Sequence, residues 1–399
     1  MRHGFLPATA AAIALSGCPV PAPADLAPRE LVADRTLPTG KGPHGIAVAA
    51  GVVVQANPAG GTIDLFDAEK ETLIKTLTPA DLGTLVGGVA TASPGLTKAT
   101  PDGTYALTAD PAIPGVRVLK PGEARQVATV DIGPLKPSSR IVWADATTAY
   151  LSVTSEGGGV NALKLAWKNG FEAPPEKEPL AITRAGVDKG AGGSIGLGAG
   201  FLALANGTDN SVSFVSLAAP AAITSLQLGN NPGPVDIVNP AGRPLLVFGN
   251  RNSNTVVVYD LQSRATIATL PVGTTPTDMV ARPDGRYVYG TCRGAANVCV
   301  IDTVAGKVHG EIRVGLGLAD KPASPVHIYH AEGQEGSHQA WVGNDGDASV
   351  TIIDMQANRA IAVVKTGAGH HKMAFTPTKA FVSNLTDSTL SVIDRKALY

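Results

Sequence analysis

Charge and cysteine are both scarce in this sequence. Lys, Arg, Asp and Glu make up 16% of its 399 residues, and 32 basic against 33 acidic side chains give a formal net charge of −1. Because a phosphate backbone is bound through clustered Lys and Arg, and no basic run occurs here, we expect no nucleic-acid partner. Only three cysteines are present and the Cys-x-x-Cys-His motif is missing, which excludes covalently attached c-type haem.

Long regular segments are also missing. No extended amphipathic helical pattern is evident, and no apolar run reaches the length that a membrane-spanning helix needs. Glycine and proline are abundant instead, with 46 Gly and 30 Pro beside 44% apolar residues. This composition is typical of many short strands joined by tight turns, so we predict an all-β protein.

An eleven-residue pattern recurs eight times as a turn followed by a short apolar strand. The copies begin at Asn57, Asp110, Ser155, Asn206, Asn250, Cys292, Asn344 and Asn384. Their starts lie 40 to 53 residues apart, close to the roughly 40–50 residues of one four-stranded propeller blade. A strand precedes each hairpin turn and a strand ending in glycine often follows the pattern. Each unit is therefore expected to supply four strands, A to D.

The two ends of the chain complement each other. The last unit, from His371 to Asp394, supplies strands A to C, whereas Arg35 to Gly40 has the features of a D strand with no A to C before it. Pairing them closes a ring and removes an open sheet edge. We predict one domain over residues 34–399, an eight-bladed β-propeller, with seven blades as the alternative if residues 155–182 form no blade. The A strands should begin near His44, Leu96, Arg140, Ser194, Val235, Thr277, Val326 and His371.

The first residues have the features of an export signal. Arg2 and His3 precede a short apolar run that ends in Leu15-Ser16-Gly17-Cys18. This resembles a bacterial lipoprotein signal peptide over residues 1–17, with Cys18 as the lipid-modified residue and residues 18–33 as a Pro-rich tether. An ordinary secretory signal is the alternative. Under the lipoprotein interpretation the protein is exported to the periplasm or cell envelope, and the lipid anchor is its only membrane contact.

Cys292 and Cys299 flank the hairpin turn of the sixth blade. Strands B and C should bring them close together, and an oxidising compartment favours a disulfide between them. Free thiols are the alternative.

Four of the eight histidines fall where A strands begin: His44, His327, His370 and His371. Ring closure makes their blades, the first, seventh and eighth, neighbours at the loop-rich mouth of the channel. Clustered imidazoles suit zinc or copper, so these four residues are a candidate metal site. The alternative is that they are polar loop residues with local hydrogen bonds.

Other polar residues of the A strands have a weaker pattern. Asp236 and Asp278 fall at the position that His327 occupies in its blade, where they could extend a polar ring or bond to loop backbone. His330 and His338 are expected toward the opposite face, outside the candidate site.

The repeats resemble a known family. Ala380 to Asn384, followed by Thr389 to Asp394, resemble YVTN-repeat propellers of the YncE-like group, many of which are exported bacterial proteins. The resemblance covers roughly Arg35 to Tyr399 and is strongest from Asn206 onward. It implies the propeller fold and a binding scaffold. Relatives of the same architecture hold haem d1 or copper clusters, so the resemblance does not select an activity.

Three functions stay open on these grounds. The first is a lipid-anchored propeller that binds a ligand, metal or partner through its axial loop face, with a small molecule or an envelope protein as partner. The second is a metal- or haem d1-type enzyme or cofactor-handling protein that uses the histidine cluster, with copper or zinc as the candidate metals. The third is an interaction scaffold. We favour the first over an enzyme.

Overall fold

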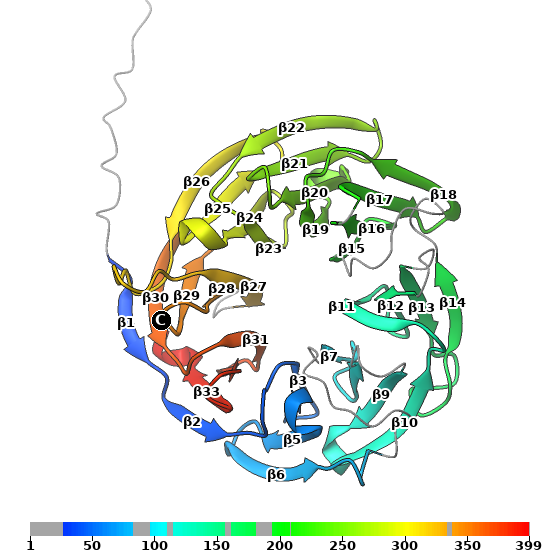
Figure 1. The fold of residues 1–399 in the computed structure, drawn as a ribbon, viewed down its shortest axis with the longest axis vertical. Coiled ribbons are helices and arrows are strands. Elements are labelled where there is room, and N and C mark those ends of the chain that lie inside the picture. The colour runs from blue at the N-terminus through cyan, green and yellow to red at the C-terminus, as the bar shows by residue number, and fades with distance from the viewer. Residues whose placement is uncertain are drawn as a thin grey trace, which may run out of the picture.

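The computed structural model describes residues 27–82, 96–109, 115–155, 161–180, 194–207, 209–332 and 337–398. Its strands form eight small sheets arranged around a common axis (Figure 1). The predicted all-β, eight-bladed propeller is confirmed. The seven-bladed alternative is wrong, because β13 (Ala162–Ala166) and β14 (Glu176–Leu180) complete the third blade.

Within each blade the A strand lies nearest the axis and the D strand lies farthest from it among strands A to D (Figure 1). Blade one consists of β3 (Ile46–Ala49), β4 (Val52–Asn57), β5 (Thr62–Asp67) and β6 (Thr72–Leu77). Blade two consists of β7 (Leu96–Ala99), β8 (Ala106–Ala109), β9 (Gly115–Lys120) and β10 (Arg125–Asp131). Blade three consists of β11 (Lys136–Trp143), β12 (Thr148–Thr154), β13 and β14. Blades four to six are β15 (Ile195–Gly198), β16 (Phe201–Asn206), β17 (Ser211–Ser216), β18 (Ala219–Leu226); β19 (Pro232–Val238), β20 (Leu245–Asn250), β21 (Thr255–Asp260), β22 (Ala265–Pro271); and β23 (Pro276–Ala281), β24 (Tyr287–Cys292), β25 (Asn297–Asp302), β26 (Lys307–Arg313). Blades seven and eight are β27 (Pro325–Glu332), β28 (His338–Asn344), β29 (Ser349–Asp354), β30 (Arg359–Lys365); and β31 (His370–Phe375), β32 (Lys379–Asn384), β33 (Thr389–Asp394).

In the described ranges, the helical elements are single 3₁₀ turns. These are η1 (Pro58–Gly60), η2 (Pro121–Glu123), η3 (Pro240–Gly242), η4 (Arg293–Ala295) and η6 (Arg395–Leu398). No helix in the described part of the chain has the length and apolar character needed to cross a membrane.

The N-terminal segment closes the ring, as predicted. Strand β2 (Arg35–Pro38) lies antiparallel to β33 and becomes the D strand of blade eight, with Leu37 opposite Leu390. Leu37 is buried and packs in one apolar cluster with Leu390 and Val392. The same segment also supplies β1 (Arg29–Val32), which pairs in parallel with β30 on the edge of blade seven. This second contact was not predicted, and its residues lie within the stretch 18–33 expected to be a tether.

The apolar core lies between adjacent blades. Tyr289 of blade six packs in one cluster with Val342 of blade seven, and Phe248 of blade five packs with Ala205 of blade four. Strands B and C carry apolar side chains on both faces because each face of these strands packs against a neighbouring sheet. Single blades therefore depend on their neighbours for burial of apolar surface.

The recurrent Asn that ends the B strand holds the B–C turn through its side chain. In blades one, four, seven and eight its Nδ2 donates to side-chain oxygens five and seven residues later, over 2.9–3.2 Å. We call this arrangement the Asn clamp. It is formed by Asn57, Asn206, Asn344 and Asn384, all fully buried. Because burial makes the loss of an amide's partners costly, the clamp accounts for the recurrence of this residue.

The glycine after the D strand has a steric cause. A Cβ on Gly367 would lie 2.6 Å from Nδ2 of Asn384, and one on Gly40 would lie 2.5 Å from Oγ1 of Thr62. Only glycine permits so close an approach of backbone to the next blade's B–C turn. Backbone hydrogen bonds join the same two regions, from Gly60 N to Lys41 O at 3.1 Å. The D–A connections and the B–C turns therefore share one face.

Candidate functional site

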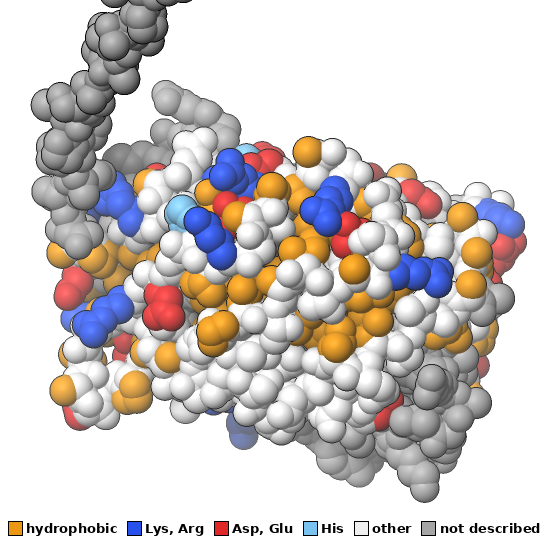
Figure 2. Space-filling model, turned by 90° about the horizontal axis from the view of Figure 1, so that it is seen from above, with side chains coloured by type: hydrophobic (Ala, Val, Ile, Leu, Met, Phe, Trp, Pro, Cys, Tyr) orange, Lys and Arg blue, Asp and Glu red, His pale blue; other side chains and the backbone are white. Residues whose placement is uncertain are grey.

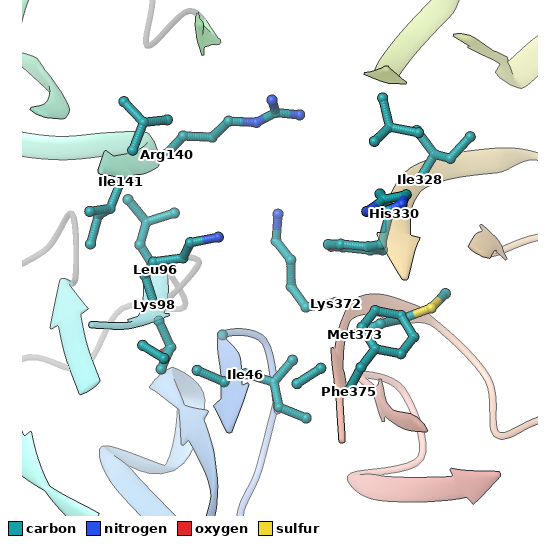
Figure 3. A pocket seen from close by; sticks show the side chains of 18 of the residues that line it. Ile46, Leu96, Lys98, Arg140, Ile141, Ile328, His330, Lys372, Met373 and Phe375 are labelled. Carbon is teal, nitrogen blue, oxygen red and sulfur yellow. The ribbon is translucent and has the colours of Figure 1, made fainter. Parts of the chain in front are cut away.

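The inner strands surround a cavity of about 490 Å³ on the propeller axis. Its lining comes from the A strands β3, β7, β11, β19, β23, β27 and β31, so seven of the eight blades contribute. Figure 3 shows side chains from these strands converging on one space. A cavity of roughly 300–1,000 Å³ is in the range that holds small ligands and cofactors.

Polar and charged side chains lie at two levels of the A strands around the axis. Asp278 and His327 lie opposite the penultimate residue of their B strands, and Lys372 N lies 3.3 Å from Oγ of the penultimate residue Ser383. Two residues further on, the equivalent level holds Lys98, Asp236 and Tyr329. Because alternate residues of a strand face the same side, both levels point at the axis.

One ion pair crosses the channel. Arg140 of blade three contacts Asp278 of blade six, and Nδ1 of His327 lies 3.3 Å from the other oxygen of the same carboxylate. The Asp278 side chain is only 8% exposed. Burial alone would raise the pKa of Asp278, but Arg140 and His327 outweigh burial and hold it well below its usual range. Asp278 in turn raises the pKa of the Arg140 guanidinium. The pair is therefore charged under all ordinary conditions.

Two lysines line the cavity beside this pair. Lys98 comes from blade two and Lys372 from blade eight, and both ammonium groups point into the open space in Figure 3. Among the described residues, the channel's ion pairs are those of Asp278 with Arg140 and His327, and neither lysine takes part in one. Burial, and then Arg140, lower the pKa of Lys98. Burial lowers the pKa of Lys372 to about 8, with Arg140 and Lys98 acting in the same direction.

The opposite wall carries the second carboxylate. Asp236 of blade five lines the cavity and its Oδ1 accepts a hydrogen bond from Ile237 N at 2.9 Å. Burial raises the pKa of Asp236 to about 6 although Arg140 opposes the shift. Burial also raises the pKa of Tyr329 well above its usual value. The described lining thus holds three cationic side chains against two carboxylates, and one of the two ionises with difficulty.

Apolar side chains complete the lining. These are chiefly Ile46, Leu96, Ile141, Ile328, Met373 and Phe375 (Figure 3). His330 also lines the cavity, and its Nε2 lies 3.1 Å from Nδ1 of His338. Burial and then His338 lower the pKa of His330. His330 lies opposite Ala340, away from the B–C turn of its blade, as expected, but its place in the lining of the cavity was not predicted.

Charge is distributed differently on the outside. Figure 2 shows a side wall of the ring, where basic and acidic side chains are scattered among uncharged ones and form no patch of one sign. The exposed arginines Arg243 and Arg286 are paired with Asp260 and Asp302. In the part of the chain that the structure describes, Lys98 and Lys372 of the channel have no comparable ion-pair partner.

The structure describes the side chains of two of the four histidines predicted as a metal site, His44 and His327. The backbone N–H of His44 donates to Ala56 O at 2.9 Å, and Nδ1 of His327 lies 3.3 Å from Oδ2 of Asp278. His370 and His371 belong to β31, but their side chains lie outside the described residues. The described residues contain no group of three or more His, Cys, Asp or Glu arranged to hold a metal. The metal site therefore stays a prediction.

The predicted equivalence of Asp236 and Asp278 is wrong, although both residues reach the cavity. Asp278 lies opposite the penultimate B-strand residue Thr291, whereas Asp236 lies opposite Val247, two steps further along its ladder. Both A strands carry an irregularity near their start, which hides the register from a count along the sequence.

Cys292 and Cys299 are both buried free thiols in the structure. Each Sγ lies near Gly290 O, at 3.8 Å for Cys292 and 3.3 Å for Cys299. The predicted disulfide is not formed here and stays a prediction. The predicted signal peptide and Cys18 lie outside the described residues.

Sequence reasoning gave no role to Lys98, Arg140 and Lys372. A usable signal was present at Lys98, which is the one basic residue of the short A strand Leu96-Thr97-Lys98-Ala99. A charged residue at an inward position of a buried strand is unusual unless it is paired or meets a ligand.

Comparison with known proteins identifies a fold and no family. No protein-family model matches the chain, and no curated protein matches its sequence. Among solved structures, the chain is similar to the dihydro-heme d1 dehydrogenase NirN in complex with DHE, with TM-score 0.58 and 15% identity over 80% of this chain. The match spans 66% of that protein, just under two thirds of its length. The chain is also similar to Kuenenia stuttgartiensis hydrazine synthase, with TM-score 0.51 and 17% identity over 91% of this chain and 97% of that one.

Proposed function

We propose that the protein binds a small anionic ligand, with carboxylate or phosphate groups, in the cavity on the propeller axis. One observation carries this proposal: Lys98 and Lys372 line the cavity beside Arg140, and neither lysine forms an ion pair among the described residues. The ammonium groups of Lys98 and Lys372 share a poorly hydrated space and repel each other, and a bound anion relieves that repulsion.

The geometry assigns a role to each group. Asp278 neutralises Arg140 and holds its guanidinium in place across the channel. Arg140 therefore adds little net positive charge to the cavity. Lys98 and Lys372 are left as the anion-binding groups. The apolar side chains of Ile46, Met373 and Phe375 would contact the uncharged body of the ligand. A few charged groups in a largely apolar cavity is the pattern expected of a specific small-molecule site.

Binding of defined anions tests the proposal. Titration calorimetry with phosphate, citrate and a porphyrin dicarboxylate should detect at least one ligand whose affinity falls at least tenfold in a Lys98→Met, Lys372→Met double variant. A Lys307→Met, Lys396→Met variant is the matched control, because it removes the same charge from exposed positions. Equal affinities of the two variants would refute the proposal.

A tetrapyrrole with carboxylate side chains is a second candidate ligand. The likeness to a protein solved in complex with DHE favours it, as does the cavity, which offers lysines for carboxylates and the His330 imidazole. Such a group would supply redox chemistry. An absorption titration with haem, in which His330→Ala shifts the Soret band and His309→Ala does not, would support it. Identical spectra in both variants would exclude His330 as a ligand.

The histidine metal site needs a separate test. Metal analysis of natively purified protein should find stoichiometric copper or zinc that a His44→Ala, His371→Ala variant loses. A metal-free preparation would exclude copper and zinc as cofactors of this protein.

We also propose, on sequence grounds alone, that the protein is exported and lipid-anchored through Cys18. The support is Leu15-Ser16-Gly17-Cys18 after a short apolar run. Metabolic labelling with a fatty acid should mark the wild type but not a Cys18→Ser variant, and label on both proteins would contradict the assignment.

A further inference from the structure

Blade six carries two cysteines where other blades carry the Asn clamp. Cys292 ends β24 at the position of the clamp Asn, and Cys299 lies seven residues later on β25. The same later position holds Ser213, Thr351 and Ser391 in blades four, seven and eight. In those blades the side-chain atoms of the two positions are 2.9–3.1 Å apart. Because blade six has the same B–C register, its backbone directs the two sulfur atoms toward each other.

A missing side chain leaves room for the pair. Cys299 lies opposite Gly290 and Cys292 opposite Asn297, so the cysteines are diagonal neighbours. A Cβ on Gly290 would come within 3.0 Å of Cys299 Sγ. Diagonal residues are usually too far apart for a disulfide, and a glycine at this point lets the sulfur of Cys299 lean toward Cys292.

Both thiols are sealed inside the protein. Each cysteine is 0% exposed, and Cys292 packs against Gly273 at the end of the preceding blade's D strand. The hydrogen bond with Cys292, and burial, raise the pKa of the Cys299 thiol well above its usual value. Because neither thiol is accessible to a reagent, any reaction must wait until this B–C turn opens.

We propose that Cys292 and Cys299 form a reversible redox pair, whose disulfide replaces the Asn clamp at the junction of blades five and six. The oxidant is a disulfide carried by a protein or a small molecule. One cysteine thiolate attacks a donor sulfur and forms a mixed disulfide, and the second cysteine thiolate then displaces the donor. The first attack releases one sulfur of the donor as a thiolate and the second attack releases the other, so the donor is reduced to two thiol groups that hold both electrons. The two cysteine protons pass to these released thiolates.

The disulfide would close a short loop between Cys292 and Cys299, and thiol–disulfide exchange would require the B–C turn to open. A cross-link over so few residues removes little chain entropy, so oxidation should raise Tm by only a few degrees. The native protein should exchange slowly and the unfolded protein quickly.

Equilibration in glutathione buffers, followed by alkylation and mass spectrometry, tests the pair on the intact wild type. We expect a monomer 2 Da lighter with both thiols protected, and a Tm that falls by a few degrees after reduction in denaturant and refolding. A Cys292→Asn, Cys299→Ser variant rebuilds the clamp of blades four and eight and should have one Tm in both buffers. Full alkylation of both thiols in oxidised buffer, or an exclusively intermolecular disulfide, would overturn the proposal.

Discussion

The B and C strands of the blades are built alike, whereas the A strands around the axis differ from blade to blade. Four blades repeat the Asn clamp with nearly the same distances. The A-strand residues that line the cavity differ instead: they include Lys98 in blade two, Asp236 in blade five, Asp278 in blade six and Lys372 in blade eight. The uniform part stabilises the ring, and the part that varies sets the chemistry of the channel. If this division is correct, stability and ligand binding should respond to different substitutions.

The seam should give the largest effect on the uniform part. Leu37→Asp places a charge in the apolar cluster that joins β2 to β33, and we expect it to lower the free energy of unfolding by at least ~3 kcal/mol. Urea denaturation measures the change. Thr36→Asp, on the exposed side of the same strand, is the control. Similar losses for both variants would mean that β2 does not close the ring through Leu37.

A substitution in the Asn clamp should lower the free energy of unfolding by less than Leu37→Asp does, and it should not change anion binding. Asn344→Ala removes the Nδ2 donor that Ser349 and Thr351 share, which should cost about 2 kcal/mol. Exposed Asn252→Ala should change stability by less than ~0.5 kcal/mol. Thermal unfolding with and without ligand measures both quantities. A large loss of anion affinity in the clamp variant would break the division between the two regions.

Substitutions in the channel should affect anion binding and should not lower stability. Lys98→Met with Lys372→Met should weaken anion binding at least tenfold while stability stays unchanged or rises, because two poorly hydrated like charges are removed. Calorimetry and denaturation of the same preparation measure the two effects. A protein that loses stability together with affinity would show that these lysines belong to the scaffold.

The pH dependence of binding should be smaller still. The protonated Lys372 ammonium binds the anion and its pKa is about 8, so affinity for sulfate should fall several-fold as pH rises from 7 to 9.5. Sulfate keeps its own charge over this range. Lys372→Met should flatten the profile, and an unchanged slope in that variant would exclude Lys372 as the titrating group.

The sequence predicted the uniform region well because its physics is local. Turn residues, alternation and the spacing of the repeat each point to the same hairpin, and the unpaired D strand at Arg35 pointed to closure. Strand β1 was missed because Arg29–Val32 pairs in parallel on an outer edge and has one partly buried residue, which leaves no pattern to read.

The channel was harder to predict because its residues meet only in three dimensions. Arg140 and Asp278 are 138 residues apart, and their contact depends on ring closure and on long side chains that reach across the axis. The irregular start of each A strand also shifts the register, so that Asp236 and Asp278 were wrongly aligned. His44 and His327 were placed near the correct face, but a shared ligand point could not be inferred from repeat position.

Anomalous diffraction from crystals soaked in selenate tests the central claim most directly. The account predicts a selenium peak in the axial cavity, within hydrogen-bonding distance of Nζ of both Lys98 and Lys372, that is lost in the double methionine variant. An empty cavity at a selenate concentration that fills sites on the outer surface would contradict it.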